Sequence, residues 1–156
     1  MKPSNRLATS VACLSAAVAA VLATDTANAA TSCADLAKLT LPQTRITLAE
    51  RVPACAFAAP GVQQPLQVPA LCRVAGVVEP AIKFEVWLPE GQTWNGRFQA
   101  VGGGGLAGII SYPAMAEAVR SGYASSSTDT GHESTDFTWL VDRQRVIDYG
   151  YRAIHE

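Results

Sequence analysis

Four consecutive glycines, Gly102–Gly105, follow a short apolar strand and constrain this chain more than any other feature. Glycine gives up side-chain packing and carries the largest backbone entropy cost, so such a run requires a compensating reason. The usual reasons are a backbone φ above zero and the close approach of a backbone N–H to another group. A glycine loop at the end of a sheet strand also lets an enzyme direct bare amides at a developing negative charge. The run therefore indicates either a tight structural turn or part of an active site.

The sequence around the glycines separates three functional interpretations. Phosphate binding is disfavoured, because the chain has neither Gly-Lys-Ser/Thr nor a GxGxxG followed by an acidic residue at the proper distance. A flexible linker would have polar flanks, whereas this run lies between a predicted strand, Arg97–Val101, and the apolar segment Leu106–Ile110. An oxyanion-hole loop after the third strand of an α/β-hydrolase fits the flanks, since a backbone N–H there complements the one beside the nucleophile. From the residues alone, a structural turn is an equal alternative.

The first thirty residues have the composition of an export signal. A short basic start precedes an apolar run, Val11–Ala23, which is too short to span a bilayer. Ala27-Asn28-Ala29 supplies the small-x-small pattern of a cleavage site, after Ala29 or Ala30. We therefore expect residues 1–30 to be a signal peptide, and the protein to be secreted or periplasmic without a membrane attachment after its removal.

Removal of that leader leaves a mildly acidic chain. The basic count falls from 12 to 10 and the acidic count from 13 to 12, so the net charge is about −2. Such a balance gives no electrostatic attraction for nucleic acid or for an anionic membrane. Neither is expected as a partner.

Three cysteines remain after the leader: Cys33, Cys55 and Cys72. An exported chain can keep disulfides, so an odd number means one pair and one leftover, or a partner elsewhere. A bridge between Cys33 and Cys72 would attach the amino-terminal arm to the predicted sheet. Metal binding is disfavoured, because no two cysteines have a CxxC spacing and His132 and His155 stand apart.

The order of predicted elements indicates an α/β fold with helices covering a central sheet. We expect a short helix and then an extended stretch within residues 31–48, and a proline-rich surface loop or extended arm without a helix over residues 52–70. The first strands are expected to pair antiparallel through short turns, and a helical crossover makes the next pair parallel. The predicted strands are Thr44–Leu48, Val74–Val78, Ile82–Leu88, Arg97–Val101 and Tyr123–Asp129, and the predicted helices are Pro113–Arg120 and Arg145–Glu156.

The last predicted helix places Ile147, Tyr151 and Ile154 on one face. No Gly, Asn or Pro ends its pattern before Glu156. We therefore expect the chain to be a fragment of a longer protein, interrupted within a helix.

Ser127, Asp129 and His132 occur together and suggest a catalytic triad. Successive side chains of a strand point to opposite faces, however, and the chain has no G-x-S-x-G elbow. We favour Asp129 and His132 as hydrogen-bonding partners of the neighbouring loops, and no residue has the setting of a catalytic nucleophile. Aromatic side chains usually serve burial. We expect core or loop anchors at Trp87, Trp94 and Trp139.

Several blocks, in the same order along the chain, resemble the tannase and feruloyl esterase family of secreted serine esterases. The resemblance covers about residues 33–156, and the family includes enzymes that act on gallate, ferulate and terephthalate monoesters. The matching blocks are Leu71–Val74, Ile82–Pro89, Trp94–Phe98, Val101–Gly108, Gly122–Ala124, Ser127–His132 and Asp148–Glu156.

This resemblance implies an α/β-hydrolase with a Ser-His-Asp triad and a large lid domain. It implies a nucleophile in a Gly-Cys-Ser-x-Gly-Gly elbow further along the chain, so that the triad, the lid and the calcium site of the lid lie outside residues 1–156. Within them, Gly103 resembles the residue whose backbone N–H lines the oxyanion hole, with Gly104 as the alternative. Cys33 and Cys72 resemble the disulfide pair of the family, and Cys55 has no assigned role. No cofactor is expected in this part.

The expected organisation is a signal peptide (1–30), an amino-terminal arm (31–71) and the truncated first part of an α/β-hydrolase domain (72–156). The expected function of the full-length protein is hydrolysis of small aromatic esters of the feruloyl or galloyl type, and residues 31–156 alone are expected to be inactive. The alternative is a non-catalytic exported binding or structural module, or a pseudogene product. The open end of the last helix and an exposed strand edge argue against that alternative.

Overall fold

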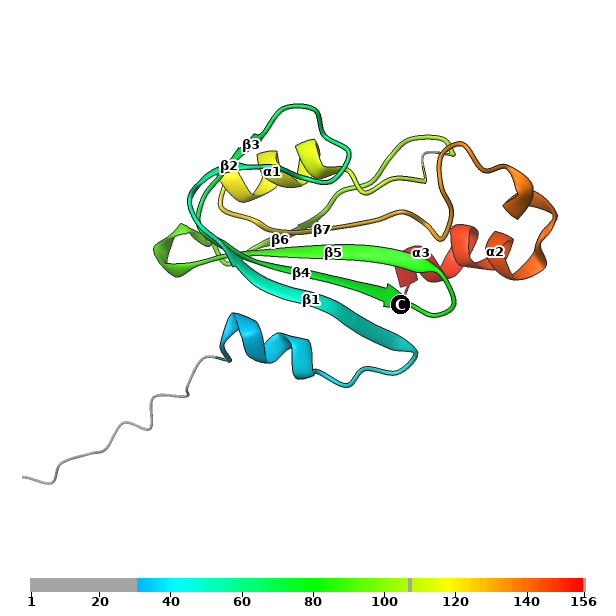
Figure 1. Cartoon of the computed structure of the whole chain (residues 1–156), viewed down its shortest axis with the longest axis horizontal. Coiled ribbons are helices and arrows are strands. Elements are labelled where there is room, and N and C mark those ends of the chain that lie inside the picture. Colours follow the sequence, from blue (N-terminus) through cyan, green and yellow to red (C-terminus); the bar gives the residue numbers. More distant parts are fainter. Residues whose placement is uncertain (1–30, 107, 156) are drawn as a thin grey trace, which may run out of the picture.

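A mixed β-sheet with helices packed against it forms the body of the molecule. The computed structural model describes residues 31–106 and 108–155 (Figure 1). The α/β fold expected from the sequence is confirmed, and the expected signal peptide lies outside the described residues. In sheet order the five strands are β1 (Thr44–Val52), β4 (Leu71–Val78), β5 (Ile82–Pro89), β7 (Ala124–Thr128) and β6 (Phe98–Ala100).

The strand order corrects one prediction about pairing. Antiparallel pairs join β1 to β4, β4 to β5 and β5 to β7, whereas β6 runs parallel to β7. A short turn links β4 to β5, as expected. The strand predicted at Arg97–Val101 does not pair with β5, because β7 lies between them. The helical crossover between β6 and β7 does give the expected parallel pair, and it is formed by α1 (Tyr112–Arg120).

Helix α1 and the middle of the sheet share the main hydrophobic core. Trp87 of β5 is fully buried, and Met115 and Val119 of α1 belong to the same cluster. Because side chains alternate along a strand, Phe84 and Val86 point to the opposite face of β5. They help to line an apolar hollow of about 710 Å³ on that face.

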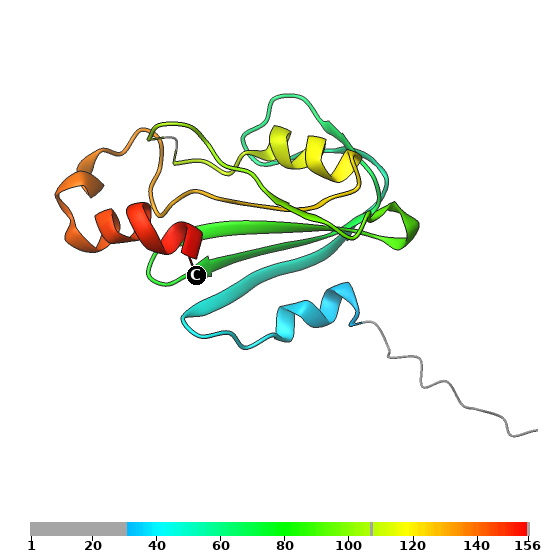
Figure 2. The ribbon, with the colours of Figure 1, turned by 180° about the vertical axis from the view of Figure 1, so that it is seen from behind.

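The proline-rich segment between β1 and β4 contains two strands that the sequence did not predict. β2 (Cys55–Phe57) and β3 (Leu66–Val68) pair antiparallel into a small separate sheet. The segment has no helix, as expected, but it is more regular than a loop. It covers the core: Phe57 packs edge-on against Trp87 with ring centroids 5.5 Å apart, and Val68 is buried. Figures 1 and 2 show this small sheet and α1 on the same side of the main sheet.

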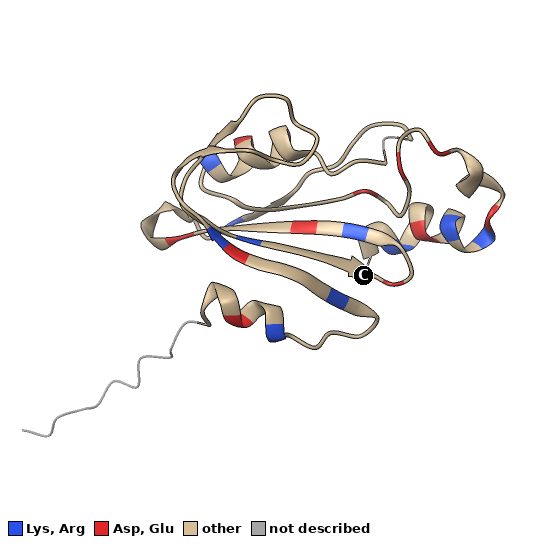
Figure 3. Ribbon diagram, in the orientation of Figure 1, with Lys and Arg blue, Asp and Glu red and all other residues tan. Residues whose placement is uncertain are grey.

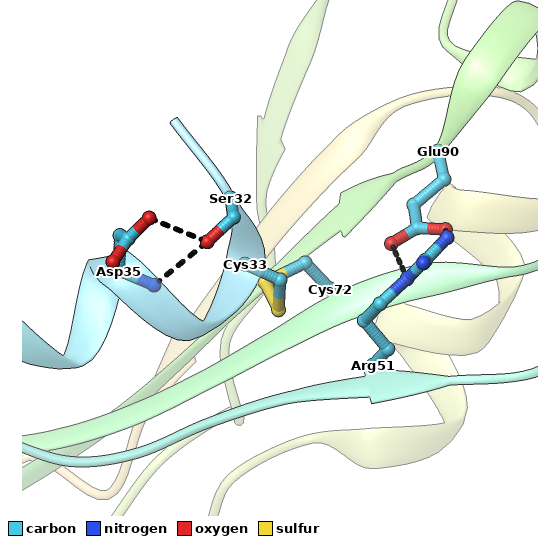
Figure 4. Close-up of a disulfide and its surroundings, with 6 residues drawn as sticks. All are labelled: Ser32, Cys33, Asp35, Arg51, Cys72 and Glu90. Carbon is cyan, nitrogen blue, oxygen red and sulfur yellow. Dashed lines mark hydrogen bonds and ion pairs between the residues drawn. A yellow bond between two sulfur atoms is a disulfide. The ribbon is translucent and has the colours of Figure 1, made fainter. Parts of the chain in front are cut away.

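A short 3₁₀ helix, Cys33–Lys38, begins the expected amino-terminal arm and lies on the other side of the sheet, next to β1 (Figures 1 and 2). The rest of that arm includes β1, which is an edge strand of the sheet itself. Ser32 caps it, since its hydroxyl oxygen accepts the Asp35 amide at 3.2 Å. A disulfide joins Cys33 to Cys72 of β4 with Cα atoms 5.6 Å apart (Figure 4). The arm is therefore linked covalently to the sheet.

The last predicted helix is divided into three pieces in the structure. It consists of α2 (Arg143–Ile147), a π-helical turn (Asp148–Arg152) and α3 (Ala153–His155). The residues expected on one apolar face are exposed, with Ile154 at 82 %. The buried side chain is instead Asp148, which pairs with Arg152 at 2.8 Å. An ion pair, and not the apolar positions, is therefore the part of this helix that is buried among the described residues.

Acidic and basic residues are interspersed over the strands and helices (Figure 3). No helix within the described ranges is long and apolar enough to cross a membrane.

Glu85 of β5 is a buried carboxylate with four hydrogen-bond donors around it. Its side chain is 3 % exposed and binds both Nε and Nη2 of Arg73, at 2.9 and 2.6 Å. It also accepts the Trp87 indole N–H at 2.8 Å and the Tyr112 hydroxyl at 2.8 Å. The hydrogen bonds to Glu85 raise the pKa of Arg73, and burial raises the pKa of Tyr112. One carboxylate thus joins β4, β5 and the first residue of α1.

We expect Glu85→Ala to lower the free energy of unfolding by about 3–5 kcal/mol, because it leaves Arg73 as a partly buried charge without its main partner. The matched control is Glu50→Ala, which removes the half-exposed second partner of Arg73 and should cost less than about 1 kcal/mol. Urea denaturation followed by tryptophan fluorescence measures both. Equal losses for the two variants would contradict a central role for Glu85.

Candidate active site

The glycine run begins a loop that is anchored to the sheet at both ends. At its start the Val101 amide donates to the Ser126 carbonyl at 2.8 Å. At its end the Ser111 amide donates to the Ser127 hydroxyl oxygen at 3.0 Å. Tyr112 follows immediately and is held by Glu85. The loop thus follows β6, and both of its ends are hydrogen-bonded to the neighbouring strand β7. It therefore lies at one end of the sheet.

The space next to the Cα atoms of Gly102 and Gly104 is empty among the described residues. Gly102 and Gly104 have φ outside the left-handed region, and no atom lies within 4 Å of the position that a Cβ would occupy. Neither their backbone conformation nor the packing of the described residues thus requires glycine there. Gly105 differs, since its φ of +61° favours glycine. Among the described residues no acceptor binds the amides of Gly102–Leu106, and all five residues are exposed.

The opposite side of the loop is held by two aromatic residues from distant segments. The Tyr149 hydroxyl donates to the Gly105 carbonyl at 2.7 Å. His132 Nε2 lies 3.3 Å from the Leu106 carbonyl, and it donates there because a carbonyl oxygen only accepts. In Figure 2 the loop passes beside the segment that follows β7. In the described residues the loop therefore has open amides, whereas two of its carbonyls are bound by side chains.

Trp139 completes the support as a third ring. Its centroid is 4.5 Å from that of His132 and 4.7 Å from that of Tyr149. His132 and Trp139 are almost fully buried, whereas Tyr149 is partly exposed. The three rings contact one another in a cluster that we call the aromatic support: His132, Trp139 and Tyr149.

Asp136 fixes the segment that brings Trp139 into the aromatic support. Its carboxylate accepts the amide and the hydroxyl of Thr138, at 2.8 and 2.6 Å, and pairs with Arg145 at 2.6 Å. The Thr138 hydroxyl and then the Arg145 guanidinium lower the pKa of Asp136 to about 2. The carboxylate is therefore ionised at neutral pH and orders the turn before α2.

Ser127, Asp129 and His132 do not form a triad. The Ser127 hydroxyl binds the Ser111 amide, and Asp129 Oδ1 accepts the amides of Lys83 and Gly131, both at 2.9 Å. Burial raises the pKa of Asp129. His132 Nδ1 contacts the Thr130 hydroxyl at 3.1 Å, so both ring nitrogens are engaged away from Ser127. The prediction that Asp129 and His132 serve as structural hydrogen-bond partners is confirmed.

The three tryptophans occupy the anchoring positions expected of them. Trp87 and Trp139 are buried. Trp94 is half exposed and donates to the Arg97 carbonyl at 3.0 Å, which closes the turn before β6. Cys55 is a free, exposed thiol. Within the described ranges, no three His, Cys, Asp or Glu side chains are grouped as metal ligands.

Comparison with known proteins identifies the family. The family model described as tannase and feruloyl esterase matches residues 66–156, which is more than half of the chain. The chain belongs to the tannase and feruloyl esterase family. The resemblance noted in the sequence is thereby confirmed.

Relatives and solved structures extend this assignment to the fold. The chain is 43 % identical to an uncharacterized esterase of Xanthomonas campestris pv. campestris, over 89 % of this chain and 25 % of that protein. It is 35 % identical to feruloyl esterase C of Talaromyces stipitatus, over 72 % of this chain and 21 % of that protein. The crystal structure of feruloyl esterase B from Aspergillus oryzae superposes with a TM-score of 0.67 and 29 % identity, over 79 % of this chain and 26 % of that one.

The chain spans about a quarter of the length of these relatives. Since the superposed structure is a feruloyl esterase, the expected α/β-hydrolase fold is confirmed for the part of the sheet that this chain holds. The sequence identified the glycine loop but missed Tyr149 as its contact. The block Asp148–Glu156 was a signal that this segment matters, but its spacing does not show a contact across 44 residues.

We expect Asp129→Ala to lower the free energy of unfolding by about 1–3 kcal/mol, because two backbone amides lose their common acceptor. Asp129→Asn keeps an acceptor oxygen in the same place and should retain most of the stability. Thermal denaturation of the two variants gives the comparison. If the Asn variant is as unstable as the Ala variant, the charge and not the acceptor is what matters.

Proposed function

We propose that the full-length protein is a serine carboxylesterase that hydrolyses small aromatic esters of the feruloyl or galloyl type. This chain supplies one side of the active site, and the nucleophile lies in a part of the protein outside residues 1–156. The observation that carries the proposal is a loop with open amides and tethered carbonyls in a member of this family. The name of one relative, feruloyl esterase C, supports the substrate class.

The role proposed for the loop follows from the charge that ester hydrolysis develops. Attack on an ester carbonyl converts its oxygen into an oxyanion, which preorganised N–H donors stabilise. The Gly103 amide is the donor that we assign, within the exposed stretch. Glycines on both sides allow the ester to approach the backbone closely, since a Cβ at Gly102 or Gly104 would project into open space. No cofactor takes part in this step.

We also propose export to the periplasm or the medium, with residues 1–30 as the signal peptide. The Cys33–Cys72 disulfide supports this, because such bonds persist in oxidising compartments. A small aromatic ester is the expected partner.

The full-length protein should hydrolyse methyl ferulate or methyl gallate, whereas residues 31–156 alone should not. Gly104→Ala should lower kcat/KM at least tenfold, because its methyl group occupies the side from which the ester approaches. Its stability should be unchanged or higher by up to about 1 kcal/mol. Steady-state kinetics and thermal denaturation of the purified protein measure the two effects.

The matched control for that substitution is Gly150→Ala. Gly150 also has φ outside the left-handed region and open space around its Cβ position, but it lies in the π-helical turn. This variant should keep full activity. Absence of ester hydrolysis by the full-length protein, or equal activity of the two variants, would refute the proposal.

A pair of proline variants tests which amide is the donor. Gly103→Pro removes the assigned N–H, and loss of one such donor costs about 2.7–4 kcal/mol of transition-state stabilisation, or a 10²–10³-fold lower kcat. Gly104→Pro removes the next amide and also adds a Cβ, so its loss is compared with that of Gly104→Ala and should be similar. Circular dichroism establishes that both proline variants fold. A loss for Gly104→Pro that exceeds the loss for Gly104→Ala by about a hundredfold or more would move the assignment by one residue.

A further inference from the structure

The turn at Gly105 and Leu106 is held differently from the ends of the glycine loop. The ends are fixed by bonds to β7. Within the described chain, the carbonyls of Gly105 and Leu106 are bound only by side chains, those of Tyr149 and His132. Glycine has the greatest conformational freedom of any residue, so a run that reaches this turn has little stiffness of its own. The two side chains therefore supply the order that the sequence of the loop lacks.

Binding of a carbonyl also fixes the direction of an amide. The Gly105 C=O and the Leu106 N–H belong to one planar trans peptide, so they point in opposite directions. Tyr149 holds the oxygen, and the N–H is thus directed away from the tyrosine hydroxyl. If the hydroxyl were absent, this peptide would be free to rotate. Among the described contacts, the glycine run would then be fixed only by the Val101 amide before it, and by the His132 contact and the Ser111 amide after it.

Tyr149 is itself held in place from two directions. Its ring packs against His132 and Trp139, with centroids 5.5 and 4.7 Å away. Its neighbour Asp148 is fully buried and binds Gln144 and Arg152, each at 2.8 Å. A buried ion pair therefore fixes the helical turn from which the tyrosine extends.

The loop is also shaped to fit the aromatic support. Gly108 has a φ of +51°, and a Cβ there would lie 2.7 Å from the ring of His132. Glycine at this position lets the backbone lie directly on the imidazole. His132 has both ring nitrogens engaged, so this ring is a fixed surface.

We propose that Tyr149 is a positioning residue of the active site: its hydroxyl holds the Gly105 carbonyl and thereby fixes the end of the glycine run, two residues after Gly103, which limits the positions that the Gly103 amide can take. This inference rests on the proposed esterase function and adds a residue to its machinery. Tyr149 does not contact the reacting atoms, and it acts through the backbone. Its effect belongs to the transition state, since the oxyanion forms after the ester binds.

The test compares Tyr149→Phe with Tyr151→Phe in the full-length protein. Tyr149→Phe removes one hydroxyl and keeps the ring in the aromatic support. We expect kcat for methyl ferulate or methyl gallate to fall about three- to tenfold, the range for one neutral hydrogen bond, with KM changed less than about twofold. Tyr151 lies on the same turn, is exposed, and has no hydrogen-bond partner for its hydroxyl among the described residues, so its variant should match the wild type.

A second measurement does not depend on catalysis. Thermolysin cleaves before leucine, and a loop must open locally to be cut. Cleavage between Gly105 and Leu106, followed by mass spectrometry, should be several-fold faster in Tyr149→Phe than in Tyr151→Phe. Melting temperatures of the two variants should agree with that of the wild type.

The outcomes separate this inference from the function on which it rests. An active wild type with equal kcat in both variants overturns the positioning role and leaves the esterase function intact. A loss of kcat with a matching fall in melting temperature or a rise in KM also overturns it, because Tyr149 would then be structural or would act in ground-state binding. If the wild type hydrolyses neither ester, the proposed function fails. Thermolysin cleavage then tests whether the Tyr149 hydroxyl holds the loop. Faster cleavage in Tyr149→Phe supports this role, and equal cleavage overturns it.

Discussion

A single buried carboxylate, Glu85, organises the elements on which the glycine loop depends. It binds Arg73 of β4, the neighbouring Trp87, and Tyr112 at the start of α1. Because Tyr112 follows Ser111, the carboxylate also sets where the loop ends. A buried charge is tolerated only when its partners are well placed, so it fixes geometry more strictly than apolar contacts do. The position of the loop is thus a consequence of electrostatics in the core.

In the glycine loop the backbone and the neighbouring side chains differ in their hydrogen bonding. The amides of Gly102–Leu106 are open, while the described side chains near them, from Ser127, His132 and Tyr149, bind the backbone of the loop. Ser127 fixes its end, and the other two fix its turn. These polar side chains therefore support the backbone of the loop. The hydrogen bonds that Ser127, Asp129 and His132 make to backbone atoms explain why they lie close together in the sequence without forming a triad.

The local elements were predictable from the sequence, and the long-range ones were not. Alternation along β5 and the apolar positions of α1 gave both elements nearly to their ends. The place of β7 between β5 and β6 was not evident, since Ala124–Thr128 is a run of small residues without alternation. The apolar pattern of the last helix did not show which side chain is buried, because that side chain is charged: Asp148 is buried with Arg152, and Ile154 is exposed. For the site, glycine chemistry indicated the loop, but no local pattern reveals a contact between Tyr149 and Gly105.

The three cysteines of the described residues, Cys33, Cys55 and Cys72, raise the question of which pair oxidises first. The native bond spans 39 residues, from Cys33 to Cys72, whereas Cys55 is only 17 residues from Cys72. Loop-closure entropy favours the shorter ring in an unfolded chain. An early bond to Cys55 would tie a strand of the small sheet to β4 and leave the arm free. Native pairing therefore depends on assembly of the sheet before oxidation, or on thiol–disulfide exchange, for which the free Cys55 thiol is itself an attacking group.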